Sequence, residues 1–167
     1  MTLEGDLTKL DCGDVDATDA TRATYSHDAS VFEVRPKVVV YPRSASDIER
    51  LVSYVSAHPG LAITPRSAGT DMTGAAVGES IVMDTTRHMN QVIDIARDVS
   101  LAGQQGMVTV QPGMFYRDLE LKTLNRGLQY PVYPASRELC AVGGIVSNNA
   151  GGEKSHTYGQ AVQWVRS

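Results

Sequence analysis

Residues 134–155 read PASRELCAVGGIVSNNAGGEKS, and this stretch decides between the possible folds of the chain. Two glycine pairs, at 143–144 and 151–152, bracket six small or apolar residues. Where side chains are this small, another backbone or a flat ligand can approach the main chain closely. Pro134 and Ser136 have the order of a turn followed by a helix N-cap, so the free N–H groups of that helix could face a phosphate. The stretch therefore predicts either a binding loop that runs into a short helix or a tight glycine-rich corner of a sheet protein.

Length, composition and charge exclude several classes of protein. A chain of 167 residues with 42% hydrophobic and 20% charged residues is typical of one globular domain or two small subdomains. The net charge of −4 provides no basic surface for nucleic acid, no apolar run approaches the ~18 residues of a membrane helix, and the N-terminus has no signal-peptide pattern. No disulfide or metal-ligand spacing occurs among Cys12, Cys140, His27, His58, His88 and His156. We therefore expect a cytoplasmic protein without a metal site, a transmembrane segment or a nucleic-acid partner.

Hydrophobic patterning in the first half of the chain predicts a small α/β unit. Strands are expected at three short apolar runs, 37–41, 61–64 and 80–83. A helix is expected over 47–57, capped by Ser44 or Ser46, and this strand–helix–strand order favours parallel pairing. The acidic residues 1–20 predict a loosely held N-terminal arm or a short helix.

The second half of the chain shows a different pattern. Alternating apolar and polar residues at 91–95 and 107–110 predict two strands. A helix is expected over 115–125, ended by Gly127 as a C-cap glycine. This helix leads directly toward the glycine-rich stretch at 134–155.

A second glycine-rich loop, residues 65–78, follows the second expected strand, where α/β units place phosphate-binding turns. Gly69 and Gly74 have the spacing of a P-loop, but Ala75 and Ala76 stand where that motif needs lysine and a hydroxyl residue. A dinucleotide fingerprint also fails, because the glycines are too far apart and no amphipathic helix follows. The loop is therefore interpreted as a source of backbone donors and hydroxyl groups able to wrap a diphosphate.

Two charged residues in this loop have opposite expected effects on an anionic ligand. Arg66 could add positive charge, although a single loop arginine is usually solvated. Asp71 would repel a phosphate if its carboxylate pointed inward. We expect the Asp71 side chain to point outward or to cap a turn.

Eight short motifs carry a family resemblance and occur in that family's order over about residues 25–159. They are Tyr25…Asp28-Ala-Ser30, Pro36-Lys-Val-Val-Val-Tyr-Pro42, Pro65-Arg-Ser-Ala-Gly-Thr70, Val110-Gln-Pro-Gly113, Pro134-Ala-Ser136, Val142-Gly-Gly144, Asn149-Ala-Gly-Gly152 and Tyr158-Gly159. The chain resembles the FAD-binding domain of the FAD-linked oxidases, of the vanillyl-alcohol-oxidase or p-cresol-methylhydroxylase type. Within that family it looks most like the D-lactate and glycolate dehydrogenase branch.

The resemblance implies an α+β fold of two α+β subdomains with FAD in the cleft between them. It divides the chain into an N-terminal arm at 1–24, a first subdomain at 25–98 and a second subdomain at 99–167. The second subdomain is expected to be incomplete at its C-terminal end, so the chain resembles an N-terminal fragment of the family. The missing part would be a C-terminal cap domain or a partner chain.

The resemblance also implies which residues bind FAD. The first loop would wrap the pyrophosphate through backbone N–H groups, and the second would pass close to the ribityl chain and the flavin. The residues assigned in this way are Pro65, Arg66, Ser67, Ala68, Gly69, Thr70, Asp71, Met72, Pro134, Ala135, Ser136, Gly143, Gly144, Asn149, Ala150 and Gly151. The chain departs from the family at Ala68, where glycine is frequent, and at Ile145, where asparagine is frequent.

Binding is expected to be non-covalent. Relatives that attach FAD covalently use a histidine just after the glycines of the first loop, and Thr70 stands at that place. Some relatives add a cysteine from the second loop, but Cys140 lies closer to the glycine pair at 143–144 than that cysteine does.

The function implied is that of the FAD-binding part of an oxidoreductase that removes a hydride from a small 2-hydroxy acid. No catalytic residue is assigned, because in this branch the catalytic residues belong to the cap domain, and the isolated chain is expected to be inactive. One alternative is a non-catalytic module that binds FAD weakly or not at all. Another is an oxidase or reductase of the same fold that acts on a sugar alcohol or a cell-wall precursor.

Overall fold

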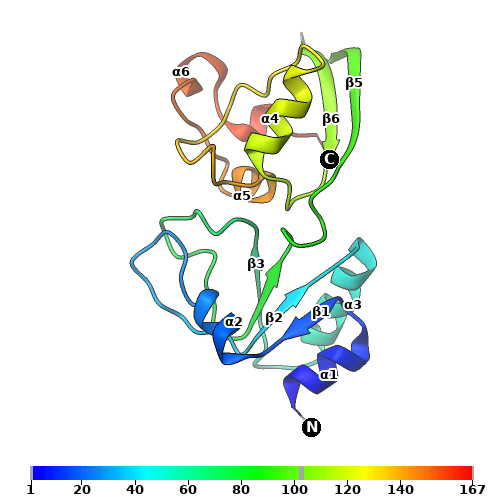
Figure 1. Ribbon diagram of the computed structural model, residues 1–167, viewed down its shortest axis with the longest axis vertical. Helices are drawn as coiled ribbons and strands as arrows, with labels where there is room; N and C mark the ends of the chain where they lie inside the picture. Colours follow the sequence, from blue (N-terminus) through cyan, green and yellow to red (C-terminus); the bar gives the residue numbers. More distant parts are fainter. Residues whose placement is uncertain (1, 102–103, 167) are drawn as a thin grey trace.

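The chain forms two halves that meet through loops, with the N-terminal half at the bottom of Figure 1 and the C-terminal half at the top. A computed structural model describes residues 2–101 and 104–166. The first half contains α1 (Leu3–Leu10), β1 (Asp14–Asp16), α2 (Asp19–Thr24), β2 (Val38–Tyr41), α3 (Ala45–Ser56), β3 (Ile63–Arg66) and β4 (Ile81–Asp84). The second half contains β5 (Val92–Leu101), β6 (Gln104–Val110), α4 (Tyr116–Leu124), α5 (Val142–Ser147), α6 (Ser155–Tyr158) and the 3₁₀ turn η1 (Ala161–Gln163).

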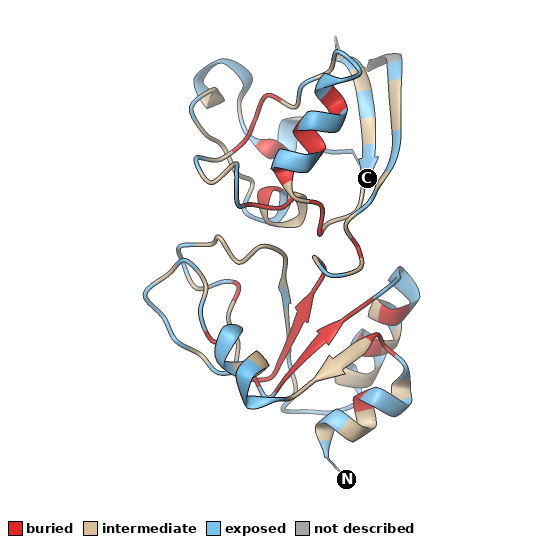
Figure 2. Cartoon of the chain, in the orientation of Figure 1, coloured by how far each residue is buried: buried red, intermediate tan, exposed pale blue. Residues whose placement is uncertain are grey.

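A four-stranded sheet with the order β1-β2-β4-β3 forms the centre of the first half. β2 and β3 both pair with β4 in parallel, as the strand–helix–strand order predicts, and β1 pairs antiparallel with β2. Figure 2 shows β2 and β4 buried along their whole length. Both strands are rich in β-branched residues, which suit a sheet that is covered on both faces.

Helix α3 covers one face of this sheet and begins at a side-chain cap. The Ser44 hydroxyl accepts a hydrogen bond from the Asp47 N–H at 3.3 Å, and the Asp47 carboxylate accepts one from the Arg43 N–H at 2.7 Å. Ser44, one of the two predicted capping residues, is therefore the N-cap. The apolar stripe of the helix turns Leu51 into the core between α1 and the strands, where none of its side chain is exposed.

Leu51→Ala is expected to lower the free energy of unfolding by about 2–5 kcal/mol, because it leaves a cavity among fully buried neighbours. Urea unfolding of the full-length protein, followed by far-ultraviolet circular dichroism, measures the change. The matched control is Val52→Ala, since Val52 is on the same helix but half exposed. Equal effects of the two substitutions would contradict the assigned core.

The acidic N-terminal segment is packed onto the sheet, so the prediction of a loosely held arm is wrong and the alternative of a short helix is right. α1 is capped by Thr2, whose hydroxyl accepts from the Gly5 N–H, and Leu7 and Cys12 are fully buried in the first core. β1 then adds an edge strand that was not predicted. Leu3, Leu10, Val15 and Ala17 also pack against this core, so the apolar side chains of the segment dock it onto the sheet despite its many acidic residues.

The second half is built on the antiparallel strand pair β5 and β6, with α4 next to β6 and α6 farther from the strands (Figure 1). The strands predicted at 91–95 and 107–110 form here but are longer, and α4 forms within the predicted 115–125. A second core joins α4 to the glycine-rich stretch through Tyr116, Tyr133, Cys140, Ile145 and Ala161. The division at residues 24 and 98 into an arm and two subdomains stays a proposal; β5 runs across the second boundary.

Candidate functional site

The two glycine-rich loops, whose hydrogen-bonded residues are 77 positions apart in the sequence, meet where the halves of the chain face each other. Between them lies a cavity of about 380 Å³. The first loop follows β3, at the carboxyl edge of the parallel strands, where α/β sheets commonly bind ligands. The second loop contributes α5 and the turns before and after it. A cavity formed by both loops favours the binding-loop interpretation of residues 134–155 over a purely structural corner.

Two hydrogen bonds join the loops across the cavity. The Gly144 N–H donates to the Ser67 hydroxyl at 3.0 Å, and the Asn148 amide Nδ2 donates to Asp71 Oδ1 at 2.9 Å. Gly144 and Asn148 are separated by one turn of α5, and Ser67 and Asp71 by the same four positions of the first loop. The first loop therefore runs alongside α5 and touches both of its ends.

The backbone N–H groups from Ser67 to Asp71 form a run of free donors. Within the described part of the chain, none of these five groups donates a hydrogen bond to protein. A buried or half-buried N–H without a partner is costly, so a run of them marks a place where an anion or water is expected. The loop supplies these donors without a nearby lysine or a P-loop hydroxyl, as the sequence predicts.

Asp71 caps the turn that follows these donors, which is one of the two orientations predicted for it. Its Oδ2 accepts from the Thr73 N–H at 2.8 Å, the Thr73 hydroxyl at 2.7 Å and the Ala75 N–H at 2.9 Å. Hydrogen bonds from the Ala75 N–H and the Thr73 hydroxyl lower the pKa of the Asp71 carboxyl to about 2. The carboxylate is therefore ionised at neutral pH, and its charge is shared among several donors.

Arg66 lines the cavity, but its guanidinium is engaged in contacts that support the first loop. Its guanidinium donates to the carbonyl oxygens of His27 at 2.7 Å and Ala76 at 3.3 Å, and it lies 5.1 Å above the ring of Tyr25. The Ala29 N–H donates to the Gly69 carbonyl at 3.1 Å. The segment around residues 25–30, which carries one of the eight motifs, therefore supports the first loop.

The start of α5 corrects the first expectation drawn from the glycine-rich stretch. The helix begins at Val142 with Ala141 as N-cap, not near Ser136. Its first N–H groups are already used: Val142 donates to Met114 O, and Gly143 to Pro112 O. Gly144 donates to the Ser67 hydroxyl, so this helix end does not offer free donors to a phosphate. Neighbouring loops reach the helix end because glycine carries no side chain to keep them away.

Most residues predicted to bind the cofactor come together at this cavity. Those lining it are Pro65, Arg66, Ser67, Gly69, Thr70, Asp71, Pro134, Ser136, Gly143, Gly144 and Ala150. Those that do not line it are Ala68, Met72, Ala135, Asn149 and Gly151. Asn149 has a left-handed backbone with φ of 45°, and its side chain holds the turn at residues 160–162 through Gln160 and Val162. The binding role of each residue stays a prediction.

The cavity also has lining residues that the sequence analysis did not assign to it. Asn148, Ser147, Cys140, Ile145 and Pro112 are among them. Pro112 belongs to the Gln111-Pro-Gly113 turn, whose Gly113 packs so closely against the Thr85 carbonyl that a Cβ has no room. The sequence could have indicated Asn148, because it follows Gly144 by one helical turn and its amide can form hydrogen bonds with a neighbouring loop.

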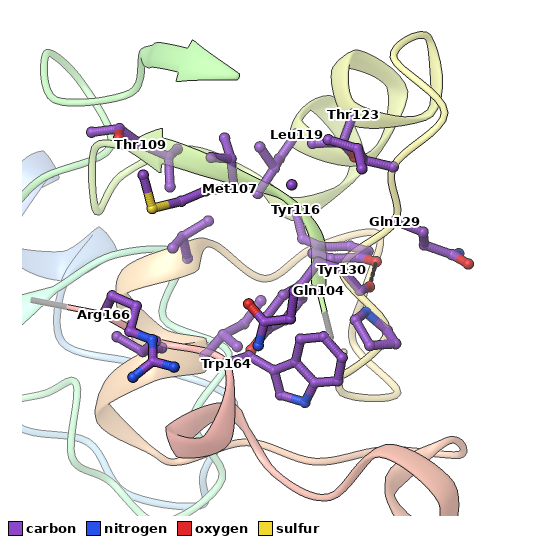
Figure 3. A pocket seen from close by; sticks show the side chains of 18 of the residues that line it. Gln104, Met107, Thr109, Tyr116, Leu119, Thr123, Gln129, Tyr130, Trp164 and Arg166 are labelled. Carbon is purple, nitrogen blue, oxygen red and sulfur yellow. Dashed lines mark hydrogen bonds between the residues drawn. The ribbon is translucent and has the colours of Figure 1, made fainter. Parts of the chain in front are cut away.

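A larger cavity of about 670 Å³ lies in the second half, between β6, α4 and the C-terminal turn (Figure 3). Its labelled lining combines apolar and aromatic residues such as Met107, Leu119 and Trp164 with polar ones such as Gln104 and Arg166. None of the residues predicted to bind the cofactor lines it. The free backbone N–H groups from Ser67 to Asp71 border the smaller cavity, which is therefore the better site for a diphosphate.

The titratable groups around the loop cavity give no sign of a reactive nucleophile. Cys140 lines the cavity but is 2% exposed, and burial raises the pKa of its thiol. A protonated thiol is a poor nucleophile. None of the four histidines lines the cavity. Across the residues that the structure describes, no group of three or more His, Cys, Asp and Glu side chains could hold a metal ion.

Comparison with known proteins decides the family. A family model described as FAD binding domain matches residues 36–167, which is most of the chain. The chain belongs to the FAD binding domain family. The resemblance drawn from the eight motifs is confirmed, and so is FAD as the cofactor of the family.

Curated relatives of this FAD-binding chain are oxidoreductases. It is 32% identical over 152 residues to the glycolate oxidase subunit GlcD of Bacillus subtilis (strain 168), covering 90% of this chain and 31% of the relative. It is 30% identical over 156 residues to the D-2-hydroxyglutarate dehydrogenase of Escherichia coli (strain K12), covering 92% of this chain and 15% of the relative. The chain thus spans less than a third of the length of either relative.

Solved structures confirm the predicted α+β fold. An alkyldihydroxyacetonephosphate synthase matches with a TM-score of 0.77 at 22% identity, over 89% of this chain and 29% of that one. The BBE-like 1 protein of Physcomitrella patens matches with a TM-score of 0.75 at 17% identity, over 98% of this chain and 34% of that one. At these identities the likeness concerns the fold alone.

The residues of the loop cavity fit the diphosphate part of FAD. The free N–H groups from Ser67 to Asp71 supply donors to an anion, and the absence of a side chain at Gly144 leaves space between the loops. A Cβ at Gly144 would approach only the Ser67 hydroxyl, at 3.1 Å. The first loop would therefore hold the diphosphate by its backbone, and α5 with Pro134 and Ser136 would face the rest of the ligand.

Proposed function

We propose that this chain binds FAD non-covalently between its two glycine-rich loops and is the flavin-binding part of a dehydrogenase of small 2-hydroxy acids, of the D-lactate or glycolate type. The observation that carries the proposal is the run of free backbone donors from Ser67 to Asp71, which opens on a cavity shared with α5. The named activities of the glycolate oxidase subunit and the hydroxyglutarate dehydrogenases support the substrate class.

The chain's own residues would bind and orient the cofactor. The N–H groups of the first loop neutralise part of the diphosphate charge, and the Ser67–Gly144 hydrogen bond keeps α5 beside that loop. When FAD is bound, the chemistry that it supplies is acceptance of a hydride from the carbon that carries the substrate hydroxyl. A base and a clamp for the substrate carboxylate are proposed to come from a cap domain or a partner chain.

Reduction of the bound flavin tests the substrate class. Full-length protein is mixed without oxygen with D-lactate, glycolate or D-2-hydroxyglutarate, and loss of the blue absorbance of oxidised flavin is recorded. At least one of these acids is expected to bleach the flavin, and L-lactate serves as the stereochemical control. Bleaching by sugar alcohols alone would overturn the 2-hydroxy-acid proposal and favour the alternative substrate class.

Non-covalent attachment leads to a separate prediction. No histidine lines the cavity, and the buried Cys140 thiol stays protonated, so nothing in the described lining is prepared to bond the flavin ring. Acid precipitation of the holoprotein is expected to release all of the yellow colour into the supernatant. Flavin fluorescence that remains with the denatured polypeptide on a gel would contradict the prediction.

A cytoplasmic location is also proposed, because both cysteines are buried and unpaired. In the described segments of the chain, no helix is both long and apolar enough to cross a membrane.

A further inference from the structure

Asp71 and Asn148 contact each other in the lining of the loop cavity. Asn148 is exposed and Asp71 half-buried, and both line the cavity. Their hydrogen bond of 2.9 Å joins the end of the first loop to the C-cap of α5. The other hydrogen bond between the loops, from Gly144 to Ser67, lies one helical turn earlier, near the start of α5. Two contacts at this spacing fix both the distance and the angle between the first loop and α5.

The two oxygens of the Asp71 carboxylate have separate roles. Oδ2 receives all three donors of its own loop, from Thr73 and Ala75. Oδ1 receives only the Asn148 amide. One oxygen therefore shapes the first loop, and the other ties that loop to α5. The bond to Asn148 can be broken without removing the cap.

We propose that Asp71 and Asn148 form a latch that holds α5 against the diphosphate loop, and that Asp71 is a positioning residue for FAD. This inference rests on the proposed function, since it concerns the same cavity. With the latch closed, the free N–H groups from Ser67 to Asp71 stay aligned with the space that α5 borders. With the latch open, only the Ser67–Gly144 contact joins these two segments, and the donors lose that alignment before FAD arrives. The latch therefore lowers the conformational entropy that the first loop loses when FAD binds.

Exchanging the two side chains gives a test that does not depend on removing either one. Asn148→Asp places a carboxylate opposite the Asp71 carboxylate and forces the latch open. Asp71→Asn keeps an oxygen for Thr73 and Ala75, and its new amide donates to Asn148 once the exposed Asn148 amide turns over. The double substitution Asp71→Asn with Asn148→Asp restores a donor opposite an acceptor. Asn125→Asp makes the same chemical change at the exposed C-cap of α4 and is the matched control.

FAD affinity is measured by quenching of flavin fluorescence with full-length apoprotein, together with the rate of FAD release and the thermal midpoint. Asn148→Asp is expected to weaken FAD binding by about tenfold or more, mainly through faster release. The double substitution is expected to recover FAD affinity to within about threefold of the parent, and Asn125→Asp, outside the cavity, is expected to bind like the parent. Recovery in the double substitution distinguishes a positioning role from a general loss of stability.

Two results would overturn the latch. One is parental FAD affinity in Asn148→Asp, and the other is a double substitution that binds as weakly as Asn148→Asp alone. If the parent protein binds no FAD at all, both the proposed function and the proposed latch are wrong. If the parent binds FAD and Asn148→Asp binds equally well, the latch alone is wrong.

Discussion

Gly144→Val is expected to abolish measurable FAD binding, with an affinity at least about 100-fold below that of the parent, equivalent to about 2.7 kcal/mol. A Cβ at this position already meets the Ser67 hydroxyl at 3.1 Å, and the two methyl groups of valine extend further into the cavity. They fill space between the loops and push the first loop away from α5. Equilibrium titration of full-length apoprotein with FAD measures the effect.

Two variants control for effects on the helix itself. Gly5 is the third residue of α1 and donates its N–H to the Thr2 hydroxyl, just as Gly144 is the third residue of α5 and donates to Ser67. Gly5→Val is expected to bind FAD like the parent, since α1 is remote from the cavity. Gly144→Ala is expected to lose less than about tenfold, because the Ser67 hydroxyl can move by a few tenths of an ångström. Parental affinity in Gly144→Val would contradict the assignment of this cavity.

Gly69→Val is expected to cause the second large loss, again about 100-fold in FAD affinity. Gly69 has a φ of 67°, which L-residues adopt at a cost, and a Cβ there would lie 2.7 Å from Cζ of Arg66. The Arg66 guanidinium is anchored on His27 and Ala76 and cannot simply move aside. The first loop must therefore change its course, and the free donors move with it.

Gly60→Val separates backbone strain from loss of the site. Gly60 has a φ of 92°, but a Cβ there would have no atom within 4 Å. Gly60→Val and Gly69→Val are each expected to lower the free energy of unfolding by about 1–2 kcal/mol. Only Gly69→Val is expected to lose FAD. If both lost FAD to the same degree, backbone strain and not the loop site would explain the result.

Local sequence signals predicted the elements that position the site. The β-branched runs of β2 and β4 form buried strands at the expected places, because such residues suit few other environments. One of the two predicted capping residues, Ser44, is the N-cap of α3, since its hydroxyl satisfies an N–H that the helix leaves free, and the helix begins two residues before the predicted 47. That the two glycine-rich loops face one ligand was implied by the family resemblance.

Contacts between distant parts of the chain could not be predicted from local patterns. The acidic first segment docks because Leu7 and Cys12 reach a core formed by later residues. The first N–H groups of α5 donate to the carbonyl oxygens of Met114 and Pro112, and the periodicity of apolar residues cannot predict such contacts. The Arg66 guanidinium binds the carbonyl oxygens of His27 and Ala76 and lies over the ring of Tyr25, and none of these partners is close to Arg66 in the sequence. Each of these outcomes depends on which segments meet in space.

The central claim is that free backbone N–H groups of the first loop hold the diphosphate of FAD. Titration of full-length apoprotein with FAD and with riboflavin, which has no phosphate, tests this claim most directly. We expect FAD to bind, ADP to compete with it, and riboflavin to bind at least about 100-fold more weakly, because charge-assisted hydrogen bonds to the diphosphate are absent. Riboflavin that binds as tightly as FAD, or an apoprotein that binds neither, would contradict the account.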